Sequence, residues 1–534
     1  MRFHSGTRFR SCQILIIIAV SIGIFPGATV AADAEKPWLG IKTPDVREQA
    51  SARYRSSYTD PAFPPLSLRL AASEDPYGDI RGENVYRYLA EIMELTVANR
   101  PEGERFWGRI AGSAAEWATA DYIGKRFQEL GLKDVHTEWV QGEEQWWPLA
   151  WDVTLLADTA YGPGTEDYPL RSAFPAIQLK TGALDVQNLE AELAFVGLGH
   201  PVDLVGRDLT GKIAVVHGVL QPDPFFQSAR GYIDGVVEAG AIGVLTMLDA
   251  PGNHQYALED MGPPGVPCFI LGGDDGRFLE DVLAAGGTAN PPRARLSLQA
   301  EVRDSWRGKN VIGLIPGQID EYVVIVAHLD GYFESANDNG AGLAAMIALA
   351  EHYAKPDVER PRRNLLFVGT SGHHEFSDGV ESFIAAHSDI LDKTALVFNV
   401  EHPSMIWSYY RGELKFKNLT VPGQLITTTS QATRGLTVSN GNPLLISFYR
   451  DAIDRYGLVI DSEIGRQPTG DAFGFFLAGY TVAQILDANL WYHSSGDLPD
   501  VIHPAGLERA TRLYAYVLDK IDASSRAELS VKGR

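Results

Sequence analysis

Histidine and carboxylate side chains recur in the second half of the chain, most of them at or shortly after an apolar run and one, Asp338, directly before a helical segment. The groups are His328 and Asp330 in YVVIVAHLD, Asp338 in SANDNGAG, His373, His374 and Glu375 after NLLFVGTSG, Glu401 and His402 in ALVFNVEH, and His493 and Asp497 in NLWYHSSGD. A single aspartate before a helix is usually an N-cap, but the groups taken together supply several potential metal ligands. Imidazole and carboxylate ligands without sulfur suit zinc, with cobalt or manganese as substitutes.

The apolar runs predict the strands of one sheet. NVIGLI, YVVIVAHLD, NLLFVGTSG, ALVFNVEH and TVAQILDA are almost continuously apolar, and several are separated by segments of helical periodicity. This pattern predicts an α/β fold with a mixed, largely parallel sheet flanked by helices. Such sheets bind ligands beyond the carboxyl ends of their strands, where these groups stand. Alternation along the strand puts His328 and Asp330 on one side, so the Asp330 carboxylate can support the imidazole.

These motifs resemble those of the co-catalytic zinc metallopeptidases, a family that includes bacterial leucyl aminopeptidase, glutamate carboxypeptidase and, as a relative, glutaminyl cyclase. The family pattern is AHLD, GANDNASG, GEE, N-x-D and YHT-x-x-D. The chain has AHLD at 327–330, SANDNGAG at 335–342, GHHE at 372–375, NVE at 399–401 and YHSSGD at 492–497. RGKNVIGLIPG, TGDAFGFFLAGYTVAQI and GSAAEWATADYI resemble further family segments, so the likeness extends over about residues 84–520.

The resemblance implies that His328, Asp338, Glu401 and His493 are metal ligands, with Asp338 bridging two ions. Asp330 matches the aspartate that supports the ligand histidine. The chain departs from the family pattern in two places. The aspartate of N-x-D is replaced by Glu401, which is one methylene longer, and His402 is an alternative ligand there. The glutamate pair is replaced by the His-His-Glu of GHHE.

The replaced glutamate pair can be aligned in two registers. Without a gap, His373 takes the position of the catalytic base and His374 that of the ligand. With a shift of one residue, His374 takes the base position and Glu375 becomes the ligand. The shifted register is favoured because it keeps a carboxylate ligand and because histidine is an ordinary general base. The predicted site then has Asp330 and His374 as catalytic residues and the following ligands of one or two zinc ions: His328, Asp338, Glu375, Glu401 and His493.

A chain of 534 residues is too long for one core of ordinary size, so several units are expected. We expect a metallopeptidase domain of two segments, 84–165 and 303–523. The block between them, 166–302, contains GKIAVV and EAGAIGVL and resembles the smaller, β-rich protease-associated domain often inserted in this family. An extension at 33–83 and a tail at 524–534 complete the predicted organisation.

The N-terminal residues are typical of a secretory signal peptide. Arginines precede the apolar run ILIIIAVSIGIF at 14–25, and the small residues GATVAADA follow it. The run is shorter than the roughly 20 apolar residues that span a membrane. We therefore expect cleavage after a signal at 1–32 and a secreted or periplasmic protein without a stable membrane anchor. Cys268 is then the one cysteine of the mature chain and is expected to be a buried, unpaired thiol.

The resemblance implies a metal-dependent hydrolase of amide or peptide bonds, most simply an aminopeptidase whose partner is a peptide or small amide. The net charge of −22 disfavours a nucleic-acid partner, because such proteins present a basic face. One alternative is a glutaminyl cyclase-like enzyme or a non-peptide amidohydrolase on the same fold. Another is a metal-binding protein whose catalysis is impaired by loss of the glutamate pair.

Overall fold

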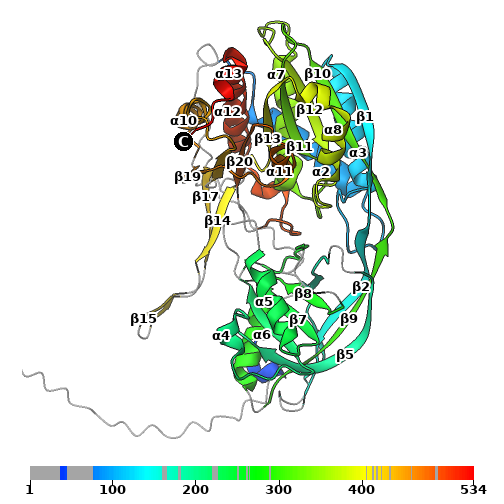
Figure 1. Cartoon of the computed structure of the whole chain (residues 1–534). Coiled ribbons are helices and arrows are strands. Elements are labelled where there is room, and N and C mark those ends of the chain that lie inside the picture. The colour runs from blue at the N-terminus through cyan, green and yellow to red at the C-terminus, as the bar shows by residue number, and fades with distance from the viewer. Residues whose placement is uncertain are drawn as a thin grey trace, which may run out of the picture.

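The computed structural model describes residues 37–44 and, with internal gaps, residues 76–533. The described ranges after residue 75 are 76–158, 161, 165–178, 182–218, 227–248, 250, 252–259, 263, 265–287, 290–403, 406–411, 414–416, 419–421, 424–431, 434–458, 460–487 and 491–533. The expected signal peptide and most of the expected extension lie outside these ranges. The chain forms two eight-stranded sheets, which lie one above the other in Figure 1.

The first sheet has the strand order β1-β10-β12-β11-β13-β20-β18-β19. Its strands are β1 (Lys133–Gly142), β10 (Trp306–Ile315), β11 (Tyr322–His328), β12 (Asn364–Thr370), β13 (Thr394–Val400), β18 (Arg434–Val438), β19 (Ile460–Gly465) and β20 (Val482–Asp487). The central strands β12, β11, β13 and β20 pair in parallel. β1 and β10 join on one side and β18 on the other in antiparallel pairs, and β19 pairs in parallel with β18. The predicted mixed sheet is confirmed.

Helices cover both faces of the first sheet because its central strands are apolar on both sides. Val323 and Ile325 of β11 face a core that includes side chains of α2, α7 and α12, whereas Val324 and Val326 face a core with α8 and α11. All four side chains are fully buried. The helices of this unit are α2 (Gly82–Ala98), α3 (Ala114–Glu129), α7 (Ala341–Tyr353), α8 (Asp378–Ala386), α9 (Ser388–Leu391), α10 (Pro443–Tyr456), α11 (Asp471–Leu477), α12 (Pro504–Ala523) and α13 (Arg526–Leu529).

The second sheet has the order β3-β2-β9-β5-β6-β7-β8-β4 and, with its helices, makes up the unit that we call the inserted unit. Its elements are β2 (Gln145–Leu155), β3 (Tyr168–Pro169), β4 (Phe174–Pro175), β5 (Leu184–Phe195), α4 (Pro201–Leu204), β6 (Ile213–Gly218), α5 (Gln227–Glu238), β7 (Gly243–Leu248), β8 (Cys268–Leu271), α6 (Gly273–Gly286) and β9 (Arg293–Arg303). The short helix η1 (Pro37–Gly40) packs against this unit through Trp38.

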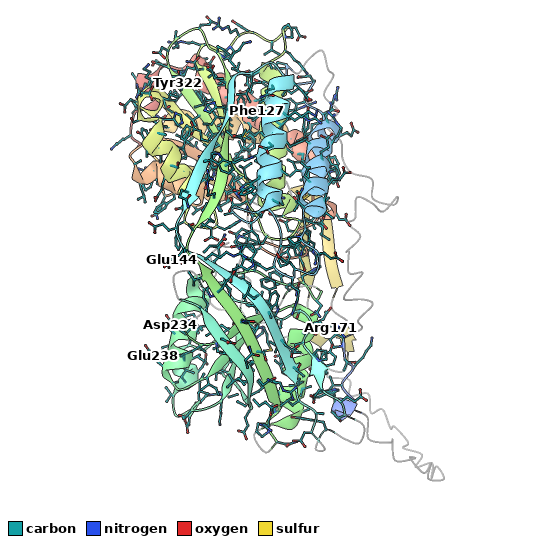
Figure 2. The ribbon with its side chains drawn as sticks, turned by 90° about the vertical axis from the view of Figure 1, so that its right-hand side faces the viewer. Phe127, Glu144, Arg171, Asp234, Glu238 and Tyr322 are labelled. Atoms are coloured by element: carbon teal, nitrogen blue, oxygen red, sulfur yellow. The ribbon has the colours of Figure 1, made fainter. Side chains whose placement is uncertain are left out.

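The inserted unit begins earlier than the boundary expected at residue 166. β2 pairs along its length with β9, and both belong to the second sheet. Figure 2 shows Glu144, just before β2, where the chain passes from one unit to the other. The chain therefore enters the inserted unit through β2 and leaves it through β9.

Smaller features complete the description of the fold. β14 (Ile406–Arg411) pairs with β17 (Gln424–Gln431), and β15 (Leu414–Phe416) with β16 (Leu419–Val421). Cys268 is a free cysteine with 1% of its surface exposed, as predicted. Across the described ranges, no helix has both the length and the apolar content needed to cross a bilayer.

Candidate metal centre

The parallel strands deliver the predicted side chains to one edge of the first sheet. His328 is the last residue of β11, the segment containing His373 follows β12, and Glu401 directly follows β13. Because β11 pairs in parallel with β12 and β13, these three strands end on the same side. Asp338 comes from the irregular helical turn η4 (Ala336–Gly340), directly before α7. The convergence expected from the strand ends is present.

Asp338 lies at the centre of the site and points its two oxygens toward different imidazoles. Oδ1 is 3.2 Å from Nε2 of His328 and 2.8 Å from Nε2 of His402. Oδ2 is 3.2 Å from Nε2 of His493 and 3.8 Å from Nε2 of His374. Burial alone would raise the pKa of Asp338, but the imidazoles of His402, His328 and His493 outweigh burial and lower it well below its ordinary value.

Four buried atoms of this cluster lack a hydrogen-bond partner within the described residues. They are Nε2 of His328, His374 and His493, and Oδ2 of Asp338. A buried polar atom without a partner is costly unless something else satisfies it. Neutral imidazole nitrogen and carboxylate oxygen are the donor atoms that zinc takes. The donor set therefore fits a metal centre.

Residues 373–375 occupy a turn in which neighbouring side chains point in different directions. The His374 imidazole faces Asp338 and His493, and the His373 imidazole stacks on that of His328 with ring centroids 3.9 Å apart. The Glu375 carboxylate accepts a hydrogen bond from Gln145 Nε2 at 3.0 Å. Three overlapping groups of side chains among the described residues have ligand atoms close enough to share an ion; His374 belongs to two of them and Glu375 to none. Burial raises the pKa of Glu375 to about 8.

His373 is held by an aspartate that motif spacing did not single out. Its Nδ1 lies 2.9 Å from Asp471 Oδ1, at the start of α11, and Thr370 donates a hydrogen bond to the other Asp471 oxygen. Burial would lower the pKa of His373, but Asp471 and Glu401 raise it well above its ordinary value. Asp471 stands in TGDAFGFFLAGYTVAQI, so the family resemblance of that segment was the available signal.

Buried groups behind the candidate ligands hold the loops that carry these residues. The Asp330 carboxylate accepts the backbone N–H groups of His373 and His374, at 3.0 and 2.9 Å. His328 Nδ1 contacts the backbone oxygen of Asp330 at 3.0 Å, whereas the nearer carboxylate oxygen is 3.9 Å away. Asp330 thus orients the turn at 373–375 through its carboxylate and the His328 imidazole through its backbone oxygen. Asp497 accepts the backbone N–H of Asp338 at 3.0 Å and holds the central carboxylate's own backbone in place.

One further carboxylate reaches the cluster from the inserted unit. Glu259 Oε1 is 3.1 Å from His374 Nδ1 and accepts a hydrogen bond from the Tyr332 hydroxyl at 2.8 Å. Glu259, His374 and His493 form one of the three groups that could hold an ion. Glu259 could not be identified from the sequence, because it stands in an ordinary acidic stretch, YALEDMG, far from every motif.

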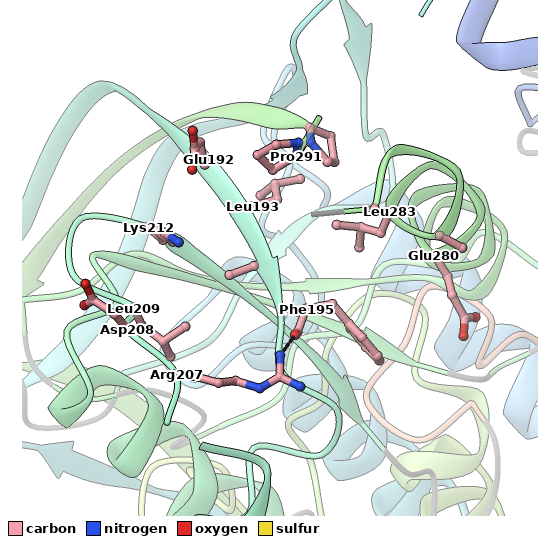
Figure 3. A pocket seen from close by; sticks show the side chains of 14 residues that line it. Glu192, Leu193, Phe195, Arg207, Asp208, Leu209, Lys212, Glu280, Leu283 and Pro291 are labelled. Atoms are coloured by element: carbon pink, nitrogen blue, oxygen red, sulfur yellow. Dashed lines mark hydrogen bonds between the residues drawn. The ribbon is translucent and has the colours of Figure 1, made fainter. Parts of the chain in front are cut away.

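A pocket in the inserted unit is separate from this centre. It has a volume of about 530 Å³ and is lined by residues of β5 and α6 together with Arg207 and Lys212 (Figure 3). The Arg207 guanidinium donates to the backbone oxygen of Phe195 at 2.6 Å. The residues that line this pocket include none of the potential metal ligands.

Comparisons with known proteins agree with this geometry. Residues 310–518 match the model of peptidase family M28. Part of the chain is 32% identical over 120 residues to the alkaline phosphatase isozyme conversion protein of Escherichia coli, which is 19% of this chain and 34% of that protein. It is 25% identical over 197 residues to a glutamate carboxypeptidase 2 homolog of Caenorhabditis briggsae, 35% of this chain and 25% of that protein. A match to the minor extracellular protease Vpr of Bacillus subtilis has 30% identity over 151 residues, 24% of this chain and 18% of Vpr. The chain thus spans about a third or less of these curated relatives.

Solved structures resemble the chain over most of its length. A peptidase M28 precursor from Shewanella amazonensis aligns with a TM-score of 0.63 and 18% identity, covering 87% of this chain and 97% of that one. The zinc aminopeptidase BSAP from Bacillus subtilis aligns with a TM-score of 0.56 and 18% identity, covering 82% and 94%. At these identities the likeness concerns the fold, and it confirms the predicted fold class.

Proposed function

We propose that the chain is a zinc-dependent hydrolase of peptide or amide bonds, most specifically an aminopeptidase, and the match of residues 310–518 to the model of peptidase family M28 supports this. The observation that carries the proposal is the convergence of the unpartnered Nε2 atoms of His328, His374 and His493 on Asp338. Three imidazoles and a carboxylate buried together are a donor set that zinc takes, and these atoms have no hydrogen-bond partner within the described residues.

The two oxygens of Asp338 support two ion positions. One ion would be held by His328, Glu401 and Asp338 Oδ1, since His328 Nε2 lies 3.9 Å from Glu401 Oε1 as well as 3.2 Å from Asp338. The second would be held by His374, His493 and Asp338 Oδ2. This assignment follows the ungapped register rather than the shifted one, because His374 faces Asp338 and Glu375 faces Gln145. Zinc is the favoured ion, with cobalt or manganese as substitutes.

His373 is proposed as the general base in place of the family's glutamate. When bound, the metal lowers the pKa of water and polarises the scissile carbonyl. In its neutral form, His373 takes a proton from the attacking water and passes it to the leaving amine. Asp471 holds Nδ1 of the imidazole and so leaves Nε2, which lies 3.9 Å from Glu401, as the atom that handles the proton. The loss of the glutamate pair is thus offset by an aspartate–histidine pair.

Two features of organisation belong to the same proposal. The N-terminal pattern supports export, and a secreted or periplasmic peptidase would act on peptides outside the cytoplasm. The inserted unit is proposed to be a protease-associated domain, with its start moved to β2 by the pairing of β2 with β9.

The proposal is tested by chelation and metal return. The purified protein is treated with a chelator and assayed on a panel of aminoacyl amides, N-acyl amino acids, dipeptides and an N-terminal glutamine peptide. We expect hydrolysis of unblocked aminoacyl substrates to disappear with chelation and to return with zinc or cobalt. Hydrolysis that resists chelation would refute the metal mechanism. Ammonia release from the glutamine peptide without cleavage would favour a cyclase, and bound metal without turnover would favour the impaired metal-binding protein.

A further inference from the structure

A short segment of the inserted unit is bonded to the loop that carries His493. Ala257 donates its backbone N–H to the backbone oxygen of His493 at 2.8 Å, and Tyr256 forms an isolated antiparallel bridge with Ser494. Gln255 accepts the backbone N–H of Ser495 at 2.9 Å. His493 has a φ of 55°, a conformation that a non-glycine residue adopts only when its surroundings impose it. The inserted unit therefore helps to fix the backbone of one proposed ligand.

The same segment ends at Glu259, which contacts a second proposed ligand. Glu259 Oε1 lies 3.1 Å from His374 Nδ1, on the side of the imidazole opposite the Nε2 that faces Asp338. Tyr332 holds both partners, because its hydroxyl donates to Glu259 and its ring stacks on the His374 ring with centroids 4.7 Å apart. Tyr332 and His374 are both buried, so this arrangement has little freedom to change.

We infer that Glu259 is a positioning residue of the metal centre, which makes the centre a site shared by the two units. A carboxylate that accepts the Nδ1–H of an imidazole fixes the ring's tautomer and leaves the Nε2 lone pair for the metal. Glu259 does this for His374, and residues 255–257 hold the backbone of His493. The inference rests on the proposed function, because it assigns a role toward the same ion.

The inference gives the inserted unit a role at the metal centre itself. The second ion position consists of Asp338 from η4 together with His374 and His493. Contacts from residues 255–259 hold both of these histidines. The first ion position, with His328 and Glu401, has no contact with Glu259 among its ion-pair contacts. The two positions should therefore respond differently to a change at Glu259.

The test is the zinc affinity of the protein, measured by competition with a chromophoric chelator for the wild type, Glu259→Ala, Glu259→Gln, Tyr332→Phe and His374→Ala. We expect Glu259→Ala to weaken one of the two wild-type sites by about 10- to 100-fold and to leave the other unchanged. Glu259→Gln should weaken it less, since the amide oxygen can still accept from Nδ1–H. Tyr332→Phe should weaken it least, because it removes only the hydroxyl that holds Glu259.

A matched control is the Glu138–His387 pair, in which His387 Nε2 lies 2.9 Å from a Glu138 oxygen but neither residue belongs to a potential ligand group. Glu138→Ala should bind zinc as the wild type does. Unchanged affinity in Glu259→Ala would overturn the inference and leave the proposed function standing. A loss in Glu259→Gln as complete as that in His374→Ala would also overturn it, because Glu259 would then be a ligand itself. A wild type that binds no zinc would instead refute the proposed function.

Discussion

Replacing Gly470 by alanine should disturb the proposed base and one proposed ligand together. Gly470 precedes α11 with φ 58° and ψ −145°, a conformation that is nearly restricted to glycine. A Cβ atom there would lie 2.7 Å from Cε1 of His373 and 2.9 Å from Oε1 of Glu401. Carbon atoms in contact normally lie about 3.5–4.0 Å apart, so one side must move by about 1 Å.

Two effects of different size follow from this geometry. The backbone conformation should lower the free energy of unfolding by about 1–3 kcal/mol. A displacement of about 1 Å at a reacting group can lower the rate by about 10²-fold. We therefore expect Gly470→Ala to lose about two orders of magnitude in kcat/KM at temperatures where the protein remains folded, with kcat/KM measured on the best substrate of the panel and folding by circular dichroism.

Gly479, which lies two residues after α11, is the matched control. Its φ is 91°, so alanine is strained there as well, but a Cβ atom would meet no atom of the described residues within 4 Å. Gly479→Ala should lose stability and retain kcat/KM. If Gly470→Ala kept the wild-type kcat/KM, or if both variants lost activity equally, the proposed placement of His373 and Glu401 in the reaction would be refuted.

Further predictions concern the proposed base, His373, and two groups away from the site, Asp79 and Cys268. His373→Ala should keep its zinc and lose about 10²–10⁴-fold in kcat, the usual size of general-base catalysis; loss of zinc from this variant, measured by elemental analysis, would make His373 a ligand instead. Asp79→Asn should lower the free energy of unfolding at pH 7 by about 1–3 kcal/mol. Burial would raise the Asp79 pKa, but its contacts with His352 and Lys355 lower it, so this stability is present above pH 3.8 and is lost as the pH falls further. Denaturant titrations should therefore show a difference in the free energy of unfolding between the wild type and Asp79→Asn that is smaller at pH 3 than at pH 7. Native Cys268 should react slowly with a thiol reagent, because burial raises its pKa to about 12.

The strands of the first sheet were predictable because the pattern of apolar residues follows directly from burial. β11 and β13 are buried on both faces, and their sequences are accordingly apolar almost throughout. Their carboxyl ends then determine where His328 and Glu401 stand. This part of the site needs no information beyond which runs are strands and which pairs are parallel.

The register at 373–375 was not predictable in the same way. Three consecutive residues of a turn point in three directions, and both alignments place a histidine and a ligand at acceptable spacing. The proposed choice of the ungapped register rests on tertiary partners: Asp471 faces His373, Asp338 faces His374, and Gln145 faces Glu375. Asp471 lies about a hundred residues along the chain from this turn and Gln145 lies on β2, so local spacing carried no information about either.

Glu259 illustrates a second limit of sequence reasoning. Its role depends on how the inserted unit docks against the first sheet, and docking is determined by the bridge at Tyr256 and by the buried aromatic residues between the units. A glutamate in a polar stretch has no periodicity or motif that marks such a contact. The boundary expected at residue 166 has a related cause, because the sequence of β2 predicts a strand in either unit and only its pairing with β9 places it in the second sheet.

The proposal that His374 and not Glu375 is a metal ligand can be tested by the zinc content of the wild type, His374→Ala and Glu375→Gln. Each protein is saturated with zinc, passed through a desalting column and analysed for zinc by mass spectrometry. We expect two zinc ions in the wild type, loss of one in His374→Ala, and both retained in Glu375→Gln, whose amide can still bond Gln145. Full zinc content in His374→Ala together with loss from Glu375→Gln would refute the ungapped register and restore Glu375 as the ligand.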